Sequence, residues 1–321
     1  MVQIDSGHRA SALSALKTGD DVFRILTLVS AVAVLIILGG VILALLLGSL
    51  PAFETFGLGF LTNQAWNPVT EKFGGFAAIM GTLTTAVIAM AIAVPVGLGI
   101  AVFLTEVCPA WLRQPIGIAV ELLAGIPSII YGIWGLFVFA PFLQTHVQPG
   151  LISLFRNVPI LSSIFAGPPY GIGTLTAGFI LSIMVLPFIS SISRDVFATV
   201  PPVLKEAAYG IGCTKGEVIR HVVLPYTRVG VIGGVMLGLG RALGETMAVT
   251  FVIGNAHHLS SSLLAPGTTI SATIANEFTE AVGDLYTSSL IALGLILFVI
   301  TFIVLSIARL MLMRLERQKG G

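Results

Sequence analysis

The sequence predicts an all-α integral membrane protein that crosses the membrane six times. Of its 321 residues, 56% are hydrophobic and only 10% are charged, whereas soluble domains carry about 25% charged residues. A membrane-spanning helix needs about 20 consecutive, mostly apolar residues. The segments that meet this requirement are residues 23–49, 76–104, 115–143, 172–196, 229–254 and 285–309.

The first apolar segment, residues 23–49, is expected to stay in the protein as a membrane anchor. It is longer than the apolar core of a signal peptide, which has about 7 to 15 residues, and no small-x-small cleavage site follows it. Residues 1–22 then form a cytoplasmic N-terminal tail, and residues 50–75 form an extracytoplasmic loop. Residues 76–309 hold the other spans as one core.

Three of the core spans contain a proline: Pro95, Pro127 and Pro187. Each proline removes one intrahelical hydrogen bond and can kink its helix, which is tolerated in membranes when neighbouring helices satisfy the freed backbone. Such kinks either serve packing or act as hinges. Both interpretations stay open from the sequence.

Lysines and arginines in the short connections predict the orientation, because they are retained on the cytoplasmic side. The predicted cytoplasmic set is Arg9, Lys17, Arg24, Arg113, Arg194, Lys205, Lys215, Arg220, Arg228, Arg309, Arg314, Arg317 and Lys319. Only Lys72 and Arg156 fall in outer loops. Both termini, including the tail at residues 310–321, are therefore expected in the cytoplasm, on a cytoplasmic (inner) membrane.

The charge balance argues against a nucleic-acid partner. The net charge is +1, with 16 lysines and arginines against 15 aspartates and glutamates. The basic residues form no patch with interleaved aromatic residues, as a nucleic-acid-binding surface would. We expect membrane lipid, and no DNA or RNA, around this chain.

The stretch "RALGETMAVTF" places Arg241 and Glu245 inside the fifth span. At 100° per residue both lie on the helix face that carries Gly230 and Gly234, so one face is small and charged. An arginine at the centre of a span costs about 2.5 to 3.5 kcal/mol. A helical pair at this spacing contributes only about 0.2 to 0.5 kcal/mol, so mutual pairing does not explain these residues.

Two interpretations of Arg241 and Glu245 remain. In the first, a buried ion pair locks two helices together, with a polar partner on a neighbouring span. In the second, the two residues line an aqueous path for a charged solute, Arg241 meeting an anion and Glu245 accepting a hydrogen bond from it. Ionisable residues inside membranes favour the second by default.

Other polar residues have simpler interpretations. Glu121 lies within about two turns of the start of its span and is expected to reach a headgroup or a neighbouring helix. The histidines all lie outside the spans, and the adjacent pair His257 and His258 lacks the spacing of zinc ligands. Cys108 and Cys213 fall in predicted cytosolic segments and should stay reduced. No metal or cofactor is expected.

The connection between the fourth and fifth spans, residues 197–228, is predicted to hold two short helices on the cytoplasmic face. The first starts at Pro202 and ends by Gly212. The second starts at Thr214, because Thr214 and Glu217 form a Thr-x-x-Glu capping box. This element is either a plain connector or a rigid docking element that passes a push from a partner to the membrane helices.

Pro225 is expected to end the second helix. The same connection also carries a recognisable motif. The match to the EAA motif (EAA, three residues, G, nine residues, IxLP) comprises Glu206, Ala207, Ala208, Gly212, Leu224 and Pro225, with Val222 in place of isoleucine. The chain therefore resembles permease subunits of ABC importers. In that family this loop is the coupling helix that sits in a groove of the ATPase subunit, which implies that Glu206 is its solvent-facing contact.

Longer stretches narrow the resemblance. "ELLAGIPSIIYGIWGLFVFAP", "GVIGGVMLGLGRALGETMAVTFVIGN" and "LGLILFVITFIVL" are similar to PstC-type permeases of high-affinity ABC phosphate importers, and the similarity extends over nearly all of the chain from about residue 20. It implies a type I ABC importer permease fold. The implied partners are a PstA-type permease, two PstB-type ATPase subunits and a PstS-type phosphate-binding protein, with Arg241 and Glu245 associated with phosphate passage.

We therefore expect a non-enzymatic permease subunit that moves inorganic phosphate inward, with ATP hydrolysis on another chain. The sequence contains no G-x-x-x-x-G-K-[ST] loop for nucleotide phosphates and no HExxH or GxSxG motif. One alternative is a permease for another oxyanion. An ion-coupled carrier is disfavoured by the docking loop and by the lack of an inverted repeat, and an intramembrane enzyme by the lack of a nucleophile with a nearby histidine.

Overall fold

The computed structural model describes residues 6–317, with side chains for residues 20–314. Within that range the chain is mostly helical, and two isolated β-bridges are its only β pairing. Six helical segments are long and apolar enough to cross a membrane, which confirms the predicted all-α class. They are Asp20–Phe56, Phe76–Val107, Ser128–Phe155, Thr174–Ala198, Lys215–Gly244 and Asp284–Arg314. Residues 1–5 and 318–321, parts of the two predicted tails, lie outside the described residues.

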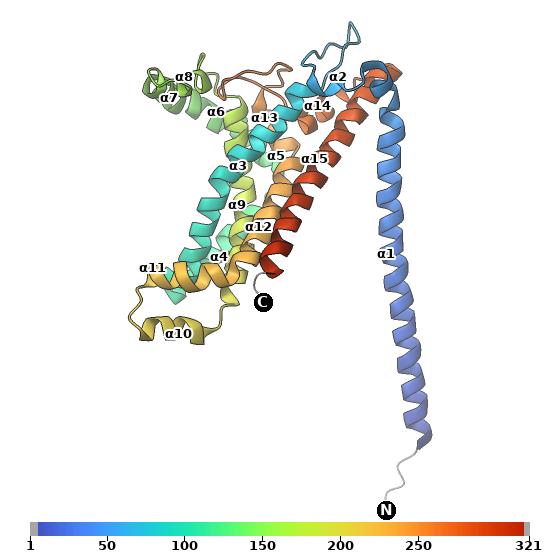
Figure 1. Ribbon diagram of the computed structural model, residues 1–321, viewed down its shortest axis with the longest axis vertical. Helices are drawn as coiled ribbons and strands as arrows, with labels where there is room; N and C mark the ends of the chain where they lie inside the picture. Colours follow the sequence, from blue (N-terminus) through green and yellow to red (C-terminus); the bar gives the residue numbers. More distant parts are fainter. Residues whose placement is uncertain (1–5, 318–321) are drawn as a thin grey trace, which may run out of the picture.

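The first helix, α1 (Ser6–Phe56), is longer than predicted at both ends. Near its C-terminal end it packs against α15 (Asp284–Arg317), where the N–H of Ala52 donates to Ser288 Oγ at 3.0 Å. Gly48 lies against Ile291 of the same helix. Figure 1 shows α1 extending away from the bundle below this contact, and its apolar side chains between Val22 and Leu50 are largely exposed.

The centre of the bundle is formed by α3 (Phe76–Val102), α9 (Thr174–Ala198) and α12 (Leu224–Gly244). The most extensive packing in the chain joins α3 to α9. Small residues allow this close approach, since lipid tails are as apolar as the side chains and packing must hold the helices together. Most of α9 is buried by its neighbours, so it is the central helix.

A stripe of glycines on α12 faces α9. A Cβ atom placed on Gly230, Gly234 or Gly238 would lie between 2.6 and 2.9 Å from a branched side chain of α9. The side chains concerned are Val196, Ile192 and Ile189 respectively. The small face inferred from the sequence is therefore a helix-packing face at these three glycines.

Two predicted spans are interrupted, contrary to the expectation of continuous helices over residues 115–143 and 229–254. The third divides into α4 (Ala110–Ala124) and α5 (Ser128–Trp134). Pro127 takes an extended conformation between them, with φ −56° and ψ 138°, and it disfavours helix at the residue before it. The interruption therefore follows from Pro127, which breaks its helix rather than kinking it.

The helical path after α5 is irregular but continuous. It comprises η2 (Gly135–Phe139), α6 (Ala140–Phe142), η3 (Leu143–Val147) and α7 (Gln148–Phe155). Here η denotes a π-helical turn. The third apolar segment of the structure thus runs from Ser128 to Phe155, so that it begins about thirteen residues after the predicted start and ends about twelve residues beyond the predicted end. The short helix α8 (Leu161–Ile164) follows it.

The fifth span ends its main helix early. α12 stops at Gly244, Glu245 is extended with φ −70° and ψ 133°, and a second helix, α13 (Met247–Ile253), follows. The helix at the other end continues through Pro225, contrary to the prediction that Pro225 ends it. There α11 (Lys215–Val218) passes into the π turn η4 (Ile219–Val223) and then into α12, because the wider turn relieves the clash of the proline ring with the preceding turn.

The end of the bundle opposite the Pro225 region is closed by loops and by α14 (Ile270–Glu277). The carboxylate of Glu277 accepts hydrogen bonds from Trp66 Nε1 at 2.6 Å and Tyr286 OH at 2.8 Å. It also pairs with His257 Nε2 at 2.7 Å. This Glu277 cluster ties the loop before α3, the loop after α13 and the start of α15 to α14.

The glycine stripe predicts opposite effects for two neighbouring glycines. Gly234→Ala forces its Cβ onto Ile192, whose branched side chain is stiff in a helix, and should destabilise the chain by about 1 to 3 kcal/mol. Gly233→Ala meets nothing within 4 Å and should stabilise by about 0.5 to 1 kcal/mol. Thermal unfolding of the purified chain in detergent checks both; equal shifts of the same sign would contradict the packing.

The Glu277 cluster predicts an acid-sensitive contact. Burial acts to raise the pKa of Glu277, but the hydrogen bonds from His257, Tyr286 and Trp66 outweigh it, so the pKa lies below its ordinary value. A lowered pKa contributes stability above the ordinary glutamate value of about 4.3, and this contribution is lost as the pH falls through the folded-state pKa.

Glu277→Gln should therefore lower the melting temperature near neutral pH and lose its difference from the wild type in acid. Melting curves between neutral pH and the acid limit measure this difference. Glu280→Gln, an exposed neighbour, serves as the control and should follow the wild type throughout. A constant offset for Glu277→Gln at every pH would rule out the titration.

Candidate functional site

The interrupted fifth span positions Arg241 in the last turn of α12. A cation is favourable there, because the C-terminal end of a helix carries partial negative charge. The guanidinium carbon lies 4.5 Å from the centre of the Phe188 ring on α9. Such a cation–π contact holds the side chain without using its N–H donors.

Those donors have no partner among residues 6–317, which the structure describes. Arg241 forms no salt bridge or hydrogen bond with another residue of the described range, and its side chain is exposed. The interpretation of a buried Arg241–Glu245 pair that locks two helices is therefore not found in this chain. Arg241 presents a fully charged fork of donors at the surface of the bundle.

Glu245 is placed differently from the sequence expectation, which set it on the same helical stripe as Arg241. It lies outside α12, in the extended segment between two helices, and is partly buried. Its Oε1 accepts a hydrogen bond at 3.3 Å from the N–H of Ala248 in the first turn of α13. The side chain thereby takes a capping role, satisfying an N–H that the helix start leaves free.

The interruptions in the third and fifth spans lie beside each other. α5 and α13 pack together, with Gly132 against Met247 and Ala248. Tyr131 OH donates to the carbonyl of Leu123 at 2.8 Å, which bridges the break in the third span. Non-helical backbone inside a membrane is tolerated only within protein or beside a water-filled cavity. Paired interrupted helices are also a common way to build a solute site in transporters.

The EAA segment forms the predicted helix, α10 (Pro202–Gly210). Glu206 and Ala207 are exposed, whereas Ala208 faces the protein and is buried. Gly212 has φ +92°, and Gly212 N–H and Cys213 N–H donate back to the carbonyls of Tyr209 and Ala208. This is a Schellman ending, in which glycine favours the left-handed residue.

The second helix of the connection starts as predicted at Thr214, where both hydrogen bonds of the capping box with Glu217 are present. Leu224 packs on an apolar cluster that residues of α3, α9, η4 and α12 form, while Pro225 is exposed. The core of this cluster comprises Ala101, Phe197, Val200, Val223 and Val231. The EAA residues thus serve two purposes, since some shape the exposed helix α10 and Leu224 packs the start of α12 into the bundle.

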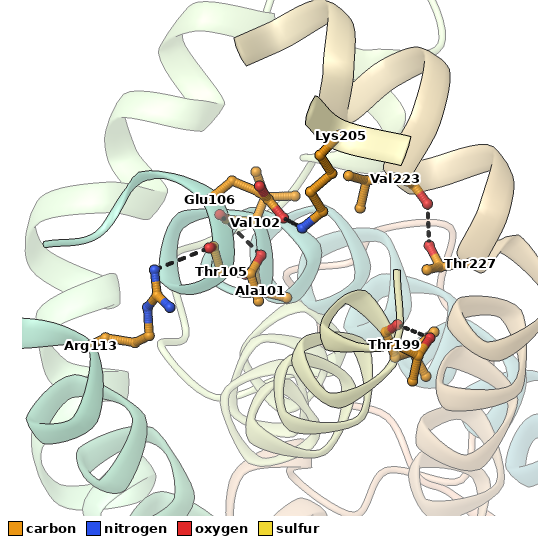
Figure 2. A network of polar contacts seen from close by, with 10 residues as sticks. Ala101, Val102, Thr105, Glu106, Arg113, Thr199, Lys205, Val223 and Thr227 are labelled. Carbon is orange, nitrogen blue, oxygen red and sulfur yellow. Dashed lines mark hydrogen bonds and ion pairs between the residues drawn. The ribbon is translucent and has the colours of Figure 1, made fainter. Parts of the chain in front are cut away.

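Figure 2 shows a contact at this end that the sequence did not indicate. Lys205 Nζ of α10 lies 2.5 Å from Glu106 Oε1, in the π turn η1 (Phe103–Val107) that continues α3. No spacing pattern relates two residues so far apart in the chain. Phe188 was missed for the same reason, because its role depends on a neighbour from another helix.

Glu121 has a structural partner, as expected. Its Oε1 lies 2.5 Å from Arg194 Nη2, which joins α4 to α9 near the α10 end. Cys108 and Cys213 are both free thiols.

Comparisons with known proteins agree with these features. The family model for the binding-protein-dependent transport system inner membrane component matches residues 93–317. The chain is 69% identical over 302 residues to the phosphate transport system permease protein PstC of Mesorhizobium japonicum, covering 94% of this chain and 92% of that one. It is 57% identical over 298 residues to PstC of Pasteurella multocida, covering 93% of each.

The fold is also that of solved ABC transporter permeases. A chain of a bacterial alginate ABC transporter, solved with its alginate pentasaccharide-bound periplasmic protein, aligns with a TM-score of 0.60 at 18% identity. The alignment covers 91% of this chain and 93% of that one. With its six apolar segments, this is a multi-pass inner-membrane protein and a transport subunit. The chain therefore belongs to the binding-protein-dependent transport system inner membrane component family and, within it, to the PstC-type permeases of ABC transporters.

Proposed function

We propose that this chain is a membrane-spanning subunit of an ATP-driven importer that moves inorganic phosphate across the cytoplasmic membrane. The main support is the position of Arg241 beside the break in the predicted fifth span. Its charged side chain is exposed and has no hydrogen-bonding partner among the described residues. The names of the close relatives support phosphate as the cargo.

The chemistry of Arg241 and Glu245 suits a protonated oxyanion. A guanidinium can bind two oxygens of one phosphate side by side. A carboxylate only accepts hydrogen bonds, so Glu245 can hold an oxyanion only through an oxygen that carries a proton. Hydrogen phosphate has such an oxygen at neutral pH and sulfate does not, which favours phosphate.

The proposed assembly follows from the two ends of the bundle. α10 projects from one end (Figure 1) and exposes Glu206 beside the apolar side chains of Val203, Tyr209 and Ile211. An exposed apolar patch with a polar rim is typical of a protein-binding surface. We infer that α10 docks on an ATPase and propose that this end of the bundle and both termini face the cytoplasm. The positive-inside rule supports this orientation.

The remaining proposed partners complete the path. A PstA-type permease would cover the exposed face that carries Arg241, and two PstB-type ATPase subunits would bind the α10 helices of the two permeases. A PstS-type binding protein would deliver phosphate at the opposite, α14 end. The nucleotide-driven step then exchanges outward-open and inward-open states of the pair.

Removing the charge of Arg241 is the direct test of the path. Arg241→Gln in the complete transporter should lower labelled phosphate uptake by about tenfold or more, in line with loss of a charged hydrogen bond. Arg241→Lys should retain part of the rate, since it keeps the charge but not the fork. The exposed Arg156→Gln is the control, and wild-type uptake by Arg241→Gln would end the proposal.

Glu245→Gln tests whether Glu245 discriminates between phosphate and sulfate. The amide oxygen still caps Ala248, but the amide N–H₂ can donate to an unprotonated oxyanion. Competition by sulfate during phosphate uptake should therefore rise in this variant and stay absent in the wild type. Equal competition by sulfate in the variant and the wild type would show that Glu245 does not recognise the proton on the anion.

A charge reversal on α10 tests the docking surface. Glu206 is exposed, so Glu206→Arg should leave the melting temperature of the permease unchanged while reducing the ATPase that co-purifies with it by about tenfold. Glu280→Arg makes the same change in charge on an exposed residue at the opposite end and should retain the ATPase. Equal recovery of ATPase from both variants would contradict docking through α10.

A further inference from the structure

The ion pair between Glu106 and Lys205 joins two charges that are badly placed for their own helices. Glu106 lies in the last turn of the helix formed by α3 and η1, and Lys205 is the fourth residue of α10. The C-terminal end of a helix disfavours an anion and the N-terminal end disfavours a cation. Each charge is therefore unfavourable in its own helix, and the pairing between the two helices compensates for both.

Burial makes the two residues depend on each other. The Glu106 side chain is 8% exposed and that of Lys205 is 22% exposed, with 2.5 Å between Nζ and Oε1. A buried carboxylate needs a charged or hydrogen-bonding partner, because water is not available to replace it. Glu121 in the neighbouring pair with Arg194 is 48% exposed, so water can solvate that carboxylate.

A π turn sets the direction of the Glu106 side chain. Glu106 lies within η1, and the extra residue of a π turn rotates the later residues of the helix by about one residue step of 100° relative to an uninterrupted α-helix. The turn is fixed from the side by Arg113 of α4, whose Nη2 donates to the carbonyl of Thr105 at 3.2 Å (Figure 2). π turns of this kind are frequent at functional sites.

The pair adds a connection that α10 otherwise lacks. α10 packs against α11 and η4, which lead into α12. Among the described residues, the bond from Lys205 to Glu106 is the one side-chain hydrogen bond between α10 and another element. It links α10 to α3, and α3 in turn packs along α9, which carries Phe188 beneath Arg241.

We propose that Glu106 and Lys205 are positioning residues that fix α10 to α3, so that a displacement of α10 moves α3 and α9 together with α12. This inference rests on the proposed function, in which an ATPase displaces α10. Without the pair, α10 would still dock and still move α12, but α3 would lose its bond to α10, and the α3–α9 unit would follow only through the packing of α12 on α9. ATP hydrolysis would then continue with little transport.

The test uses the complete transporter in proteoliposomes with the binding protein, with ATP hydrolysis and labelled phosphate uptake measured in the same vesicles. Glu106→Gln and Lys205→Met should each keep the ATPase bound but lower the phosphate moved per ATP by about tenfold, within the usual range of coupling between sites. Glu121→Gln is the matched control, because it breaks a more exposed ion pair at the same end. It should keep the wild-type ratio.

The exchanged pair, Glu106→Lys with Lys205→Glu, should restore most of the ratio. In the exchanged protein each charge also suits its own helix end. A role limited to folding would lower uptake and hydrolysis together with the bound ATPase and leave their ratio unchanged. That result, or a wild-type ratio in both single variants, would overturn the inference.

The same vesicles distinguish a failure of the proposed function from a failure of this inference. If wild-type vesicles took up no phosphate, the proposed function would fail. The stimulation of ATP hydrolysis by the binding protein still reports on the ion pair, because this readout does not depend on measured uptake. Wild type and the exchanged pair should then be stimulated, whereas Glu106→Gln and Lys205→Met should hydrolyse ATP without stimulation; equal stimulation in all would overturn the inference.

Discussion

The structure depends on one constraint of the bilayer, which is that every backbone N–H and C=O inside it must find a partner within the protein. An unpaired group costs several kcal/mol in hydrocarbon, so spans are helical unless protein or water covers the break. In the part of the chain that the structure describes, the predicted third and fifth spans are broken at Pro127 and at Glu245. Both are placed where α5 and α13 pack together, so one covered region serves both interruptions.

The break at Glu245 also explains why a charge is tolerable at Arg241. In a continuous helix over residues 229–254 this arginine would lie at the middle, at a cost of about 2.5 to 3.5 kcal/mol. Ending α12 at Gly244 instead puts Arg241 in a last turn, where the helix dipole favours a cation and Phe188 contacts it. The carboxylate of Glu245 meanwhile satisfies the start of α13. The two residues are thus close in sequence but are stabilised by different helices.

Local patterns predicted much of this structure, and contacts between distant segments account for the rest. Apolar run length identified the six spans, and the capping box at Thr214 was read from four residues. The continuation through Pro225 was missed because the π turn η4 relieves the proline clash, and no sequence signal for such a turn was available. The break at Glu245 was missed because the four-residue spacing between Arg241 and Glu245 fits a continuous helix. The hydrogen bond from the N–H of Ala248 to Glu245, which accompanies the break, cannot be inferred from that spacing. Glu106 and Lys205 meet through tertiary folding alone.

The central position of α9 decides how motion can spread in this fold. Its most apolar stretch is 61% buried, against 28% or less for the other five spans, so it has the fewest free faces on which to slide. It packs against α3 on one side and, through the glycine face, against α12 on another. Branched side chains seated on glycines resist sliding, because any shift along the axis drives them against backbone. A displacement that reaches α9 should therefore move it together with α3 and α12 rather than rearrange it locally, and Phe188 on α9 lies in contact with the guanidinium of Arg241.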